Sequence, residues 1–197
     1  MGARRRKLGV EGEDRFSGRG VSWCATCDGA FFKNKAVAVI GGGNTALEDA
    51  LYLASAGCEV ALVHRRDQFR GVDMLEKEVR AEPRITLKTP YVPVEILGGQ
   101  AVTGLALRHA VTGEPLELAV SGVFVCIGTV ANTELLAGVL PLDGEGRVTA
   151  GEDTLTAIPG VFAAGDIRKK PLYQIVTAAA DGAVAAAEAH KYVRANA

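Results

Sequence analysis

The clearest hydrophobic pattern in the chain is an apolar run followed by a helical period, and it lies in residues 36–63. Residues 36–40 are all apolar, which is typical of a strand buried on both faces of a parallel sheet. Apolar positions at helical spacing then predict a helix over 44–56, ended by Gly57. Residues 59–63 predict the next parallel strand, so this stretch should form one right-handed βαβ unit. The predicted buried face of the helix consists of Ala46, Leu47, Ala50, Leu51 and Ala54.

Shorter apolar runs follow, and they predict an antiparallel insertion. A helix over 74–81 ends near Pro83. Strands are then predicted at 85–88, 92–97, 102–108, 117–120 and 122–127, with a hairpin turn at Gly98-Gly99. The fold class is therefore α/β: a Rossmann-like parallel sheet interrupted by a three-stranded antiparallel excursion.

The two ends of the chain have weaker patterns. Residues 1–20 are polar and without clear periodicity, so they predict a leading segment or linker. Beyond Asn132 the chain is rich in Gly and Pro, until a strand at 161–164 and a final helix at 174–194. These changes predict three parts: a leading segment at 1–20, a nucleotide-binding domain at 21–130 and a C-terminal segment at 131–197.

Composition and charge narrow the functional classes. Glycine supplies 24 of the 197 residues, well above the usual ~7%, as expected for a fold with tight turns around a nucleotide. A net charge of −1 gives no overall electrostatic case for binding nucleic acid or a membrane surface. No apolar stretch approaches the ~18 residues of a transmembrane helix. We therefore expect a cytoplasmic protein.

The four cysteines are too few for a disulfide scaffold, and only Cys24 and Cys27 are spaced for joint chemistry. Cys58 and Cys126 lie in apolar surroundings and are expected to be buried structural thiols. The Cys-x-x-Cys pair could bind zinc, but no second pair supplies the other two ligands. It could also be inert, or it could exchange a disulfide, with Asp28 moving the proton. A carboxylate in this position is otherwise a turn or cap residue.

A glycine turn follows the first buried strand. The pattern Gly41-x-Gly43-x-x-Ala46 opens the predicted helix, in the context that the dinucleotide fingerprint requires. The first glycine makes the turn, the second admits the pyrophosphate, and the small third residue allows close packing. The alternative is a glycine turn that only serves the fold.

The end of the second strand indicates which nucleotide binds. An NAD site usually carries an acid there, whereas this strand ends in His64-Arg65-Arg66, with Arg70 four residues later. Guanidinium groups suit a ribose 2′-phosphate and favour NADP. Alternatively, the arginines are simply solvated. The Gly165-Asp166 pair, at the carboxyl end of the predicted strand 161–164, is on spacing alone an ordinary turn.

In combination, these motifs resemble the low-molecular-weight, bacterial-type thioredoxin reductases. The resemblance covers nearly the whole chain, through residues 7–13, 18–22, 24–29, 41–48, 64–70, 124–128, 158–166 and 174–182. It implies an NADPH- and FAD-dependent reductase of thioredoxin, a homodimer, and a redox pair Cys24–Cys27 with Asp28 as its acid. The residues implied to hold NADPH are Gly41, Gly42, Gly43, Asn44, Thr45, Ala46, His64, Arg65, Arg66 and Arg70. Those implied to contact FAD are Gly165, Asp166, Gln174 and Ile175.

Two departures from that family stand out. No Gly-x-Gly-x-x-Gly unit for the flavin precedes Gly41, so the sequence corresponds to an NADPH domain plus the C-terminal return segment of an FAD domain. In addition, Tyr173 stands where the family usually has an arginine before the glutamine of the last helix. Two hypotheses follow: a thioredoxin-disulfide reductase, or a non-catalytic NADPH-binding module with a reversible disulfide.

Overall fold

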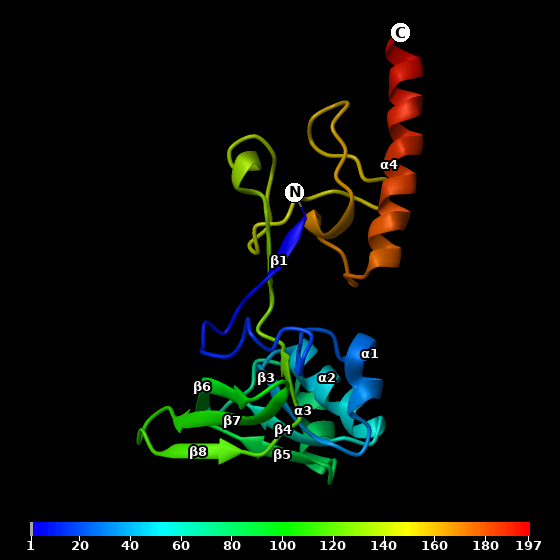
Figure 1. The fold of residues 1–197 in the computed structure, drawn as a ribbon. Helices are drawn as coiled ribbons and strands as arrows, with labels where there is room; N and C mark the ends of the chain where they lie inside the picture. Colours follow the sequence, from blue (N-terminus) through cyan, green and yellow to red (C-terminus); the bar gives the residue numbers. More distant parts are fainter. Residues whose placement is uncertain (1) are drawn as a thin grey trace. The chain divides into compact units, whose positions relative to one another are not determined.

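The computed structural model describes residues 2–197, which form two compact units (Figure 1). The sheet unit comprises residues 7–128, and the α4 unit comprises residues 2–6 together with 129–197. The divisions therefore fall after residues 6 and 128, whereas the sequence predicted them after residues 20 and 130. Each unit is described below by itself.

A five-stranded parallel sheet forms the centre of the sheet unit, in the order β2-β9-β3-β4-β5. Both faces of its central strand are covered, which explains why the sequence of that strand is apolar at every position. The predictions at 36–40, 59–63 and 85–88 are confirmed without change. The strands are β2 (Val21–Ser22), β3 (Ala36–Ile40), β4 (Glu59–Val63), β5 (Ile85–Lys88) and β9 (Gly122–Val125).

The two faces of this sheet bury different layers. Val37 and Val39 pack with the helices, while Ala38 and Ile40 pack with the antiparallel sheet, as strand alternation requires. The helical layer contains α1 (Ala25–Asp28), η1 (Gly29–Phe32), α2 (Asn44–Ser55) and α3 (Asp73–Ala81). The predicted core face of α2 is confirmed except at one position: Leu53 is fully buried, whereas Leu51 is only partly buried.

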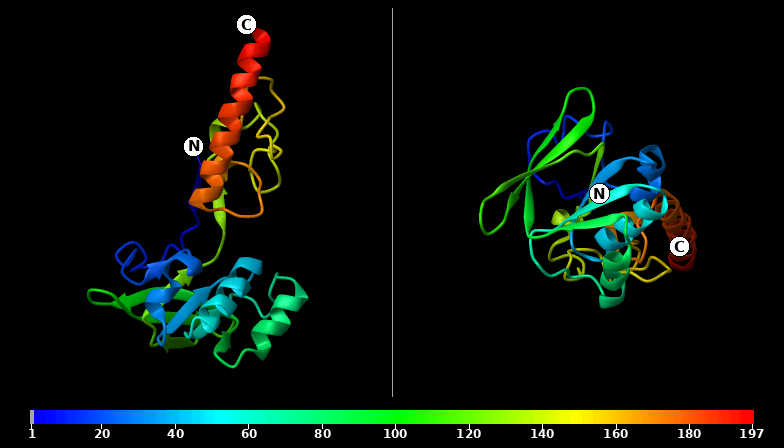
Figure 2. Two further views of the ribbon diagram at one scale, coloured as in Figure 1. Left: turned by 90° about the vertical axis from the view of Figure 1, so that its right-hand side faces the viewer. Right: turned by 90° about the horizontal axis from the view of Figure 1, so that it is seen from below.

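The predicted antiparallel excursion is also present, as a separate three-stranded sheet (Figure 2). It consists of β6 (Tyr91–Gly98), β7 (Val102–His109) and β8 (Pro115–Leu118). The strand predicted at 117–120 begins two residues earlier, because its register is set by pairing with β7. Leu105 and Leu107 of β7 are buried against the parallel sheet, so the unit has three layers.

Residues 7–20 are part of the sheet unit and not a loose leading segment. Phe16 is 1% exposed and belongs to the core between the two sheets. Glu13 is 2% exposed, and its carboxylate accepts hydrogen bonds from the backbone N–H groups of Leu8 and Gly9 at 3.0 and 2.9 Å. A buried carboxylate with two amide donors fixes the loop, although the sequence around it has no periodic pattern.

Residues 1–20 also contain a strand that the sequence pattern does not predict. Strand β1 (Ala3–Arg5) pairs antiparallel with β10 (Thr129–Ala131), in the α4 unit. The Arg4 guanidinium adds hydrogen bonds of 2.7 Å to the side chains of Asn132 and Glu134. Backbone pairing with a distant segment forms this strand, so no local alternation of apolar residues announces it.

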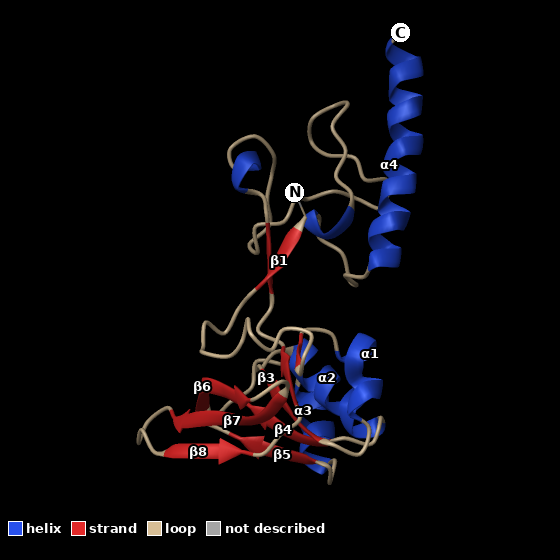
Figure 3. Ribbon diagram, in the orientation of Figure 1, coloured by secondary structure: helices blue, strands red, loops and turns tan. Residues whose placement is uncertain are grey.

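The rest of the α4 unit is mostly irregular chain beside one long helix (Figure 3). Helix α4 (Ile175–Asn196) confirms the predicted final helix, and the short helices are η2 (Glu134–Leu136) and η3 (Gly165–Ile167). The strand predicted at 161–164 is absent from the described structure. That segment finds only one bridge partner, between Leu155 and Phe162. Within residues 2–197, no helix has both the length and the apolar character that a membrane span needs.

A buried ion cluster attaches α4 to the chain before it. Asp181 of α4 accepts two hydrogen bonds from the Arg168 guanidinium, at 2.7 and 2.9 Å. It also accepts hydrogen bonds from the Lys170 ammonium at 3.1 Å and from the Gly165 backbone N–H at 2.8 Å. The hydrogen bonds from Arg168 are the main cause that holds the pKa of Asp181 far below its usual range.

Substituting Asp181→Asn should destabilise the α4 unit, because it removes the carboxylate that accepts hydrogen bonds from both buried cations. The other carboxylates near them, Glu152 and Asp166, are each 3.7 Å away. Loss of one partner of a buried ion pair costs about 3–5 kcal/mol. Since the folded pKa of Asp181 is lowered, its stabilisation is complete above the ordinary pKa of 3.8 and is lost as the pH falls below it. Urea titrations at several pH values, followed by circular dichroism, should show this acid-side slope in the parent and not in the variant.

Glu188→Gln, on the same helix, is the matched control. Its ion pair with Lys191 lies at the surface, where such pairs contribute about 0–1 kcal/mol. Equal stability of the Asp181 and Glu188 variants would contradict the assignment of Asp181 as the anchor.

Candidate functional site

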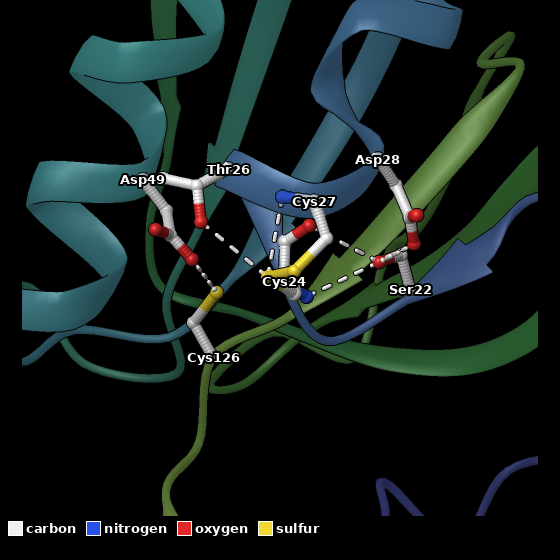
Figure 4. Close-up of a disulfide and its surroundings, with 7 residues drawn as sticks. All are labelled: Ser22, Cys24, Thr26, Cys27, Asp28, Asp49 and Cys126. Atoms are coloured by element: carbon white, nitrogen blue, oxygen red, sulfur yellow. Dashed lines mark hydrogen bonds between the residues drawn. A yellow bond between two sulfur atoms is a disulfide. The ribbon is translucent and has the colours of Figure 1, made fainter. Parts of the chain in front are cut away.

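The two cysteines of the Cys-x-x-Cys motif form a disulfide at the start of α1, with their Cα atoms 5.3 Å apart (Figure 4). Cys24 is the N-cap residue of α1, and its Sγ atom accepts the backbone N–H of Cys27 at 3.2 Å. The Thr26 hydroxyl lies 3.4 Å from the same sulfur. Because a disulfide sulfur has no proton, the hydroxyl is the donor. Two donors therefore converge on Cys24, and the helix that brings them there was not predicted from the sequence.

Asp28 lies on the other side of the disulfide from Thr26 (Figure 4). Its carboxylate accepts the Ser22 hydroxyl at 2.6 Å. The Ser22 Oγ atom in turn accepts the backbone N–H of Cys24 at 3.1 Å. Ser22 thus links the Asp28 carboxylate to the backbone of Cys24. The sequence motifs did not identify Ser22 as a site residue. The strand register of β2 brings Ser22 there, and no sequence motif marks it.

Cys126 and Asp49 form a second pair beside the disulfide, on the side of Thr26 (Figure 4). The Cys126 thiol donates to a carboxylate oxygen of Asp49 at 3.1 Å. Burial, reinforced by the Asp49 charge, raises the pKa of the Cys126 thiol, and burial also raises the pKa of Asp49. Cys58 is buried as well and donates to the carbonyl of Phe32. The expectation that Cys58 and Cys126 are buried, free thiols is confirmed.

The glycine turn follows the carboxyl end of β3 and leads into α2. A Cβ atom on Gly41 would lie 2.4 Å from the Cys126 carbonyl oxygen, and one on Gly42 would lie 2.3 Å from the His64 ring. At Gly43 nothing lies within 4 Å. Gly43 is also the N-cap of α2 and provides no side-chain cap to the N–H groups of the first turn. This is the arrangement in which a helix N-terminus binds a pyrophosphate.

The arginine loop lies against this turn. His64 is buried under Gly42 and stacks on Phe69, with ring centroids 5.4 Å apart. Burial lowers the pKa of His64, and the charges of the nearby arginines lower it further. Arg65, Arg66 and Arg70 are exposed, and none forms a side-chain hydrogen bond or ion pair within residues 2–197. The structure therefore brings the predicted nucleotide residues of the sheet unit together and leaves three guanidinium groups available for an anion.

The α4 unit contains the residues that resemblance assigns to the flavin. Asp166 lies at the edge of an open cavity of about 530 Å³, which is otherwise lined mainly by apolar side chains. Its Oδ1 atom is buried and accepts no hydrogen bond within the described residues, and the nearest cation, Lys170, is 3.7 Å away. An acceptor left open beside a cavity fits a ligand that carries hydroxyl groups, such as the ribityl chain of FAD.

The two residues at the start of α4 that are predicted to contact FAD have different surroundings. Gln174 is the N-cap, and its backbone N–H donates to the Thr177 hydroxyl at 3.1 Å. Ile175 is 90% exposed. Tyr173 stands where the family usually has an arginine. Its ring packs against another arginine, Arg147, whose guanidinium lies 4.2 Å from the ring centre. Only the structure identifies Arg147 as the cation at this place.

The comparisons with known proteins agree with this arrangement. The sequence profile described as "Pyridine nucleotide-disulphide oxidoreductase" matches residues 1–183. A thioredoxin reductase of Streptomyces clavuligerus is 45% identical over 195 residues, which are 98% of this chain and 61% of that protein. A bifunctional thioredoxin reductase/thioredoxin of Mycobacterium leprae (strain TN) is 43% identical over 194 residues, which are 98% of this chain and 42% of that protein.

Solved structures give the same result. The thioredoxin reductase from Streptococcus pyogenes MGAS5005 superposes with a TM-score of 0.91 at 38% identity, and the match covers 99% of this chain and 64% of that one. The chain thus spans about three fifths of the length of the Streptomyces clavuligerus and Streptococcus pyogenes proteins. The predicted FAD/NAD(P)-binding fold and the resemblance to thioredoxin reductases are confirmed, and the chain belongs to the pyridine nucleotide-disulphide oxidoreductase family.

Proposed function

We propose that the chain carries the NADPH-binding and dithiol parts of a thioredoxin-disulfide reductase. One observation carries this proposal: the Cys24–Cys27 disulfide and the glycine turn with its arginine loop belong to the same packed unit. Ala25 of the disulfide helix and Ala46 and Leu53 of α2 share one core. The dithiol is therefore held at a fixed position relative to the nucleotide turn.

NADPH is the nucleotide that the sheet unit suits. The open backbone at Gly43 and the uncapped start of α2 would receive the pyrophosphate. Arg65, Arg66 and Arg70 would receive the 2′-phosphate, since guanidinium groups bind phosphate in a bidentate manner. Gly42 and His64 would serve the site through packing, because the ring fills the space that a side chain at residue 42 would need.

The α4 unit would contribute to an FAD site. Asp166 would accept a hydroxyl of the flavin's side chain with its unbonded Oδ1 atom, and Gln174 and Ile175 would also contact FAD. The chemistry that FAD supplies when bound is the conversion of a hydride into an electron pair for a disulfide. Tyr173 would orient Arg147 instead of contacting the flavin as an arginine does in the family.

The reduced dithiol would then reduce thioredoxin. One thiolate of the pair attacks the disulfide of thioredoxin and forms a mixed disulfide, and the second attacks the first, which restores Cys24–Cys27 and releases reduced thioredoxin. Asp28 would supply the proton to the departing thiolate. The relative in Mycobacterium leprae carries both activities in its name, which supports thioredoxin as the partner. The implied homodimer stays a prediction, and the two free cysteines fit the cytoplasmic location that we propose.

The alternative is a module that binds NADPH without turnover. This alternative is a truncated NADPH-binding module with a reversible disulfide.

Electron transfer to the disulfide separates the two functions. Incubation of the chain with NADPH and FAD should produce two additional thiols per chain, measured with a thiol reagent after the nucleotides are removed. NADPH alone should produce none, because a nicotinamide does not readily reduce a disulfide directly. Cys27→Ser, which has no disulfide, is the control. A disulfide that stays oxidised with both cofactors present, in a chain that binds NADPH, would favour the binding module.

The arginine loop should determine the choice of nucleotide. Replacing both Arg65 and Arg66 by Ala should weaken NADPH binding about tenfold or more in calorimetry, since a hydrogen bond to a charged group contributes roughly 1.5–3 kcal/mol. NADH, which lacks the 2′-phosphate, should bind as before. Arg84→Ala removes an exposed arginine elsewhere on the sheet unit and should change neither affinity. Equal affinity of the parent chain for the two nucleotides would contradict the assignment.

Thr26 should lower the pKa of the Cys24 thiol after reduction, because its hydroxyl donates to that sulfur. In a Cys27→Ser background, Thr26→Val should move the pH profile of Cys24 alkylation to higher pH. Thr26→Ser keeps the donor and should restore the parent profile. Identical profiles for the Val and Ser variants would show that the contact does not matter to the thiolate.

A further inference from the structure

Three contacts hold the arginine loop, residues 64–72, against the glycine turn. The Arg70 backbone N–H donates to the Gly42 carbonyl at 2.6 Å. The Val72 backbone N–H donates to the side-chain Oδ1 of Asn44 at 2.9 Å. Between these two bonds lies Gly71, where a Cβ atom would approach Leu47 to 2.4 Å and the Asn44 oxygen to 3.1 Å. The far end of the loop is thus attached to the first turn of α2.

We propose that Asn44 is a positioning residue for the selection of NADPH over NADH. Its side-chain oxygen would fix the arginine loop on the glycine turn, so that the guanidinium groups face the 2′-phosphate while the turn binds the pyrophosphate. This inference rests on the proposed function and assigns Asn44 a role beyond direct contact with the nucleotide.

The place of Asn44 in the helix supports this role. Gly43 is the N-cap, so Asn44 is the first residue inside α2 and provides no cap to its own helix. Asparagine is a poor helix former except as a cap. Its carboxamide oxygen instead accepts an N–H from residue 72, 28 positions away. The side chain is therefore used to join two segments of the chain.

The attachment matters because the charged side chains have no partners of their own, and the backbone bond from Arg70 to Gly42 is the one other bond described here that holds their segment on the turn. Arg65, Arg66 and Arg70 are exposed and form no side-chain bond within residues 2–197. Their positions depend on the backbone that carries them. One end of this backbone is the buried His64, and the other end is the Asn44–Val72 bond with the close contact at Gly71. Loosening the second end would spread the guanidinium groups over more positions and weaken their joint hold on one phosphate.

The test is a comparison of NADPH and NADH affinities by calorimetry on the full chain. Asn44→Ala should weaken NADPH binding roughly three- to tenfold, the range expected for one exposed hydrogen bond, and should leave NADH binding nearly unchanged. Gly71→Ala should have the same selective effect, because its methyl group collides with Leu47. The two changes together should lose less than the product of the single losses, because both release the same loop.

Two variants serve as controls. Asn44→Asp keeps the acceptor oxygen, and its charge acts on the pyrophosphate that both nucleotides share, so the NADPH to NADH ratio should stay at the parent value. Thr45→Ala, one residue further along α2, should change both affinities alike. Circular dichroism and thermal unfolding would establish that each variant is folded.

The outcomes are distinguishable. A parent chain that prefers NADPH, with the same preference in Asn44→Ala, would overturn the role of Asn44 and leave the proposed function in place. A parent chain without preference would overturn the proposed NADPH site together with this inference.

Discussion

The structure of the site depends on one steric constraint: the chain leaves β3 through a space that admits no side chain. The space at Gly41 is bounded by the Cys126 carbonyl and the space at Gly42 by the His64 ring, each closer than 2.5 Å to where a Cβ atom would lie. Because β3 lies between β4 and β9, both of these neighbours are fixed by the sheet. Helix α2 therefore begins close to the carboxyl end of β3. Its first turn reaches the arginine loop, and its second turn brings Asp49 to Cys126.

Two groups of cations, one in each unit, differ in burial and pairing. In the α4 unit, Arg168 and Lys170 are buried and bonded to Asp181, so their charges are neutralised within the fold. In the sheet unit, Arg65 and Arg66 are exposed and unpaired within the described chain. Arginine residues left without an internal partner beside an uncapped helix start keep their full capacity for a phosphate. Burial and pairing, and not the residue type, separate the structural cations from those available to a ligand.

The sequence predicted the elements whose stabilising interactions leave a local pattern, and it missed those that depend on distant segments. Strands β3 and β4 and helix α2 were predicted because burial on one or two faces leaves a local pattern of apolar residues. Strand β1 was missed, since it exists only through pairing with a segment more than 120 residues away. The strand predicted at 161–164 failed for the converse reason, because this apolar run has one isolated bridge and no neighbouring strand with which to form a ladder. The pattern recorded burial and could not record pairing.

The same distinction applies to the site. The glycine turn, the dithiol and the arginines were recognised because each has its own spacing or charge. Ser22, Arg147 and the bond from Val72 to Asn44 were not, since each acquires its role from a residue brought near by the fold. These partners determine how the recognised residues are oriented. A motif therefore specifies which groups are present, whereas the contacts between motifs determine what those groups can bind together.

The dithiol and the nucleotide turn lie close together in the sequence, but this closeness does not by itself indicate direct electron transfer between them. Their common core explains why they occur together, because α1 packs on α2 and the two motifs flank the same strand. It does not provide a direct route for electrons, since hydride chemistry and disulfide chemistry need a flavin to connect them. The open oxygen of Asp166 belongs to the other unit, at the edge of a cavity of its own. In the proposed reductase, the order of electron transfer is therefore set by the chemistry of the cofactors and not by the order of the motifs in the chain.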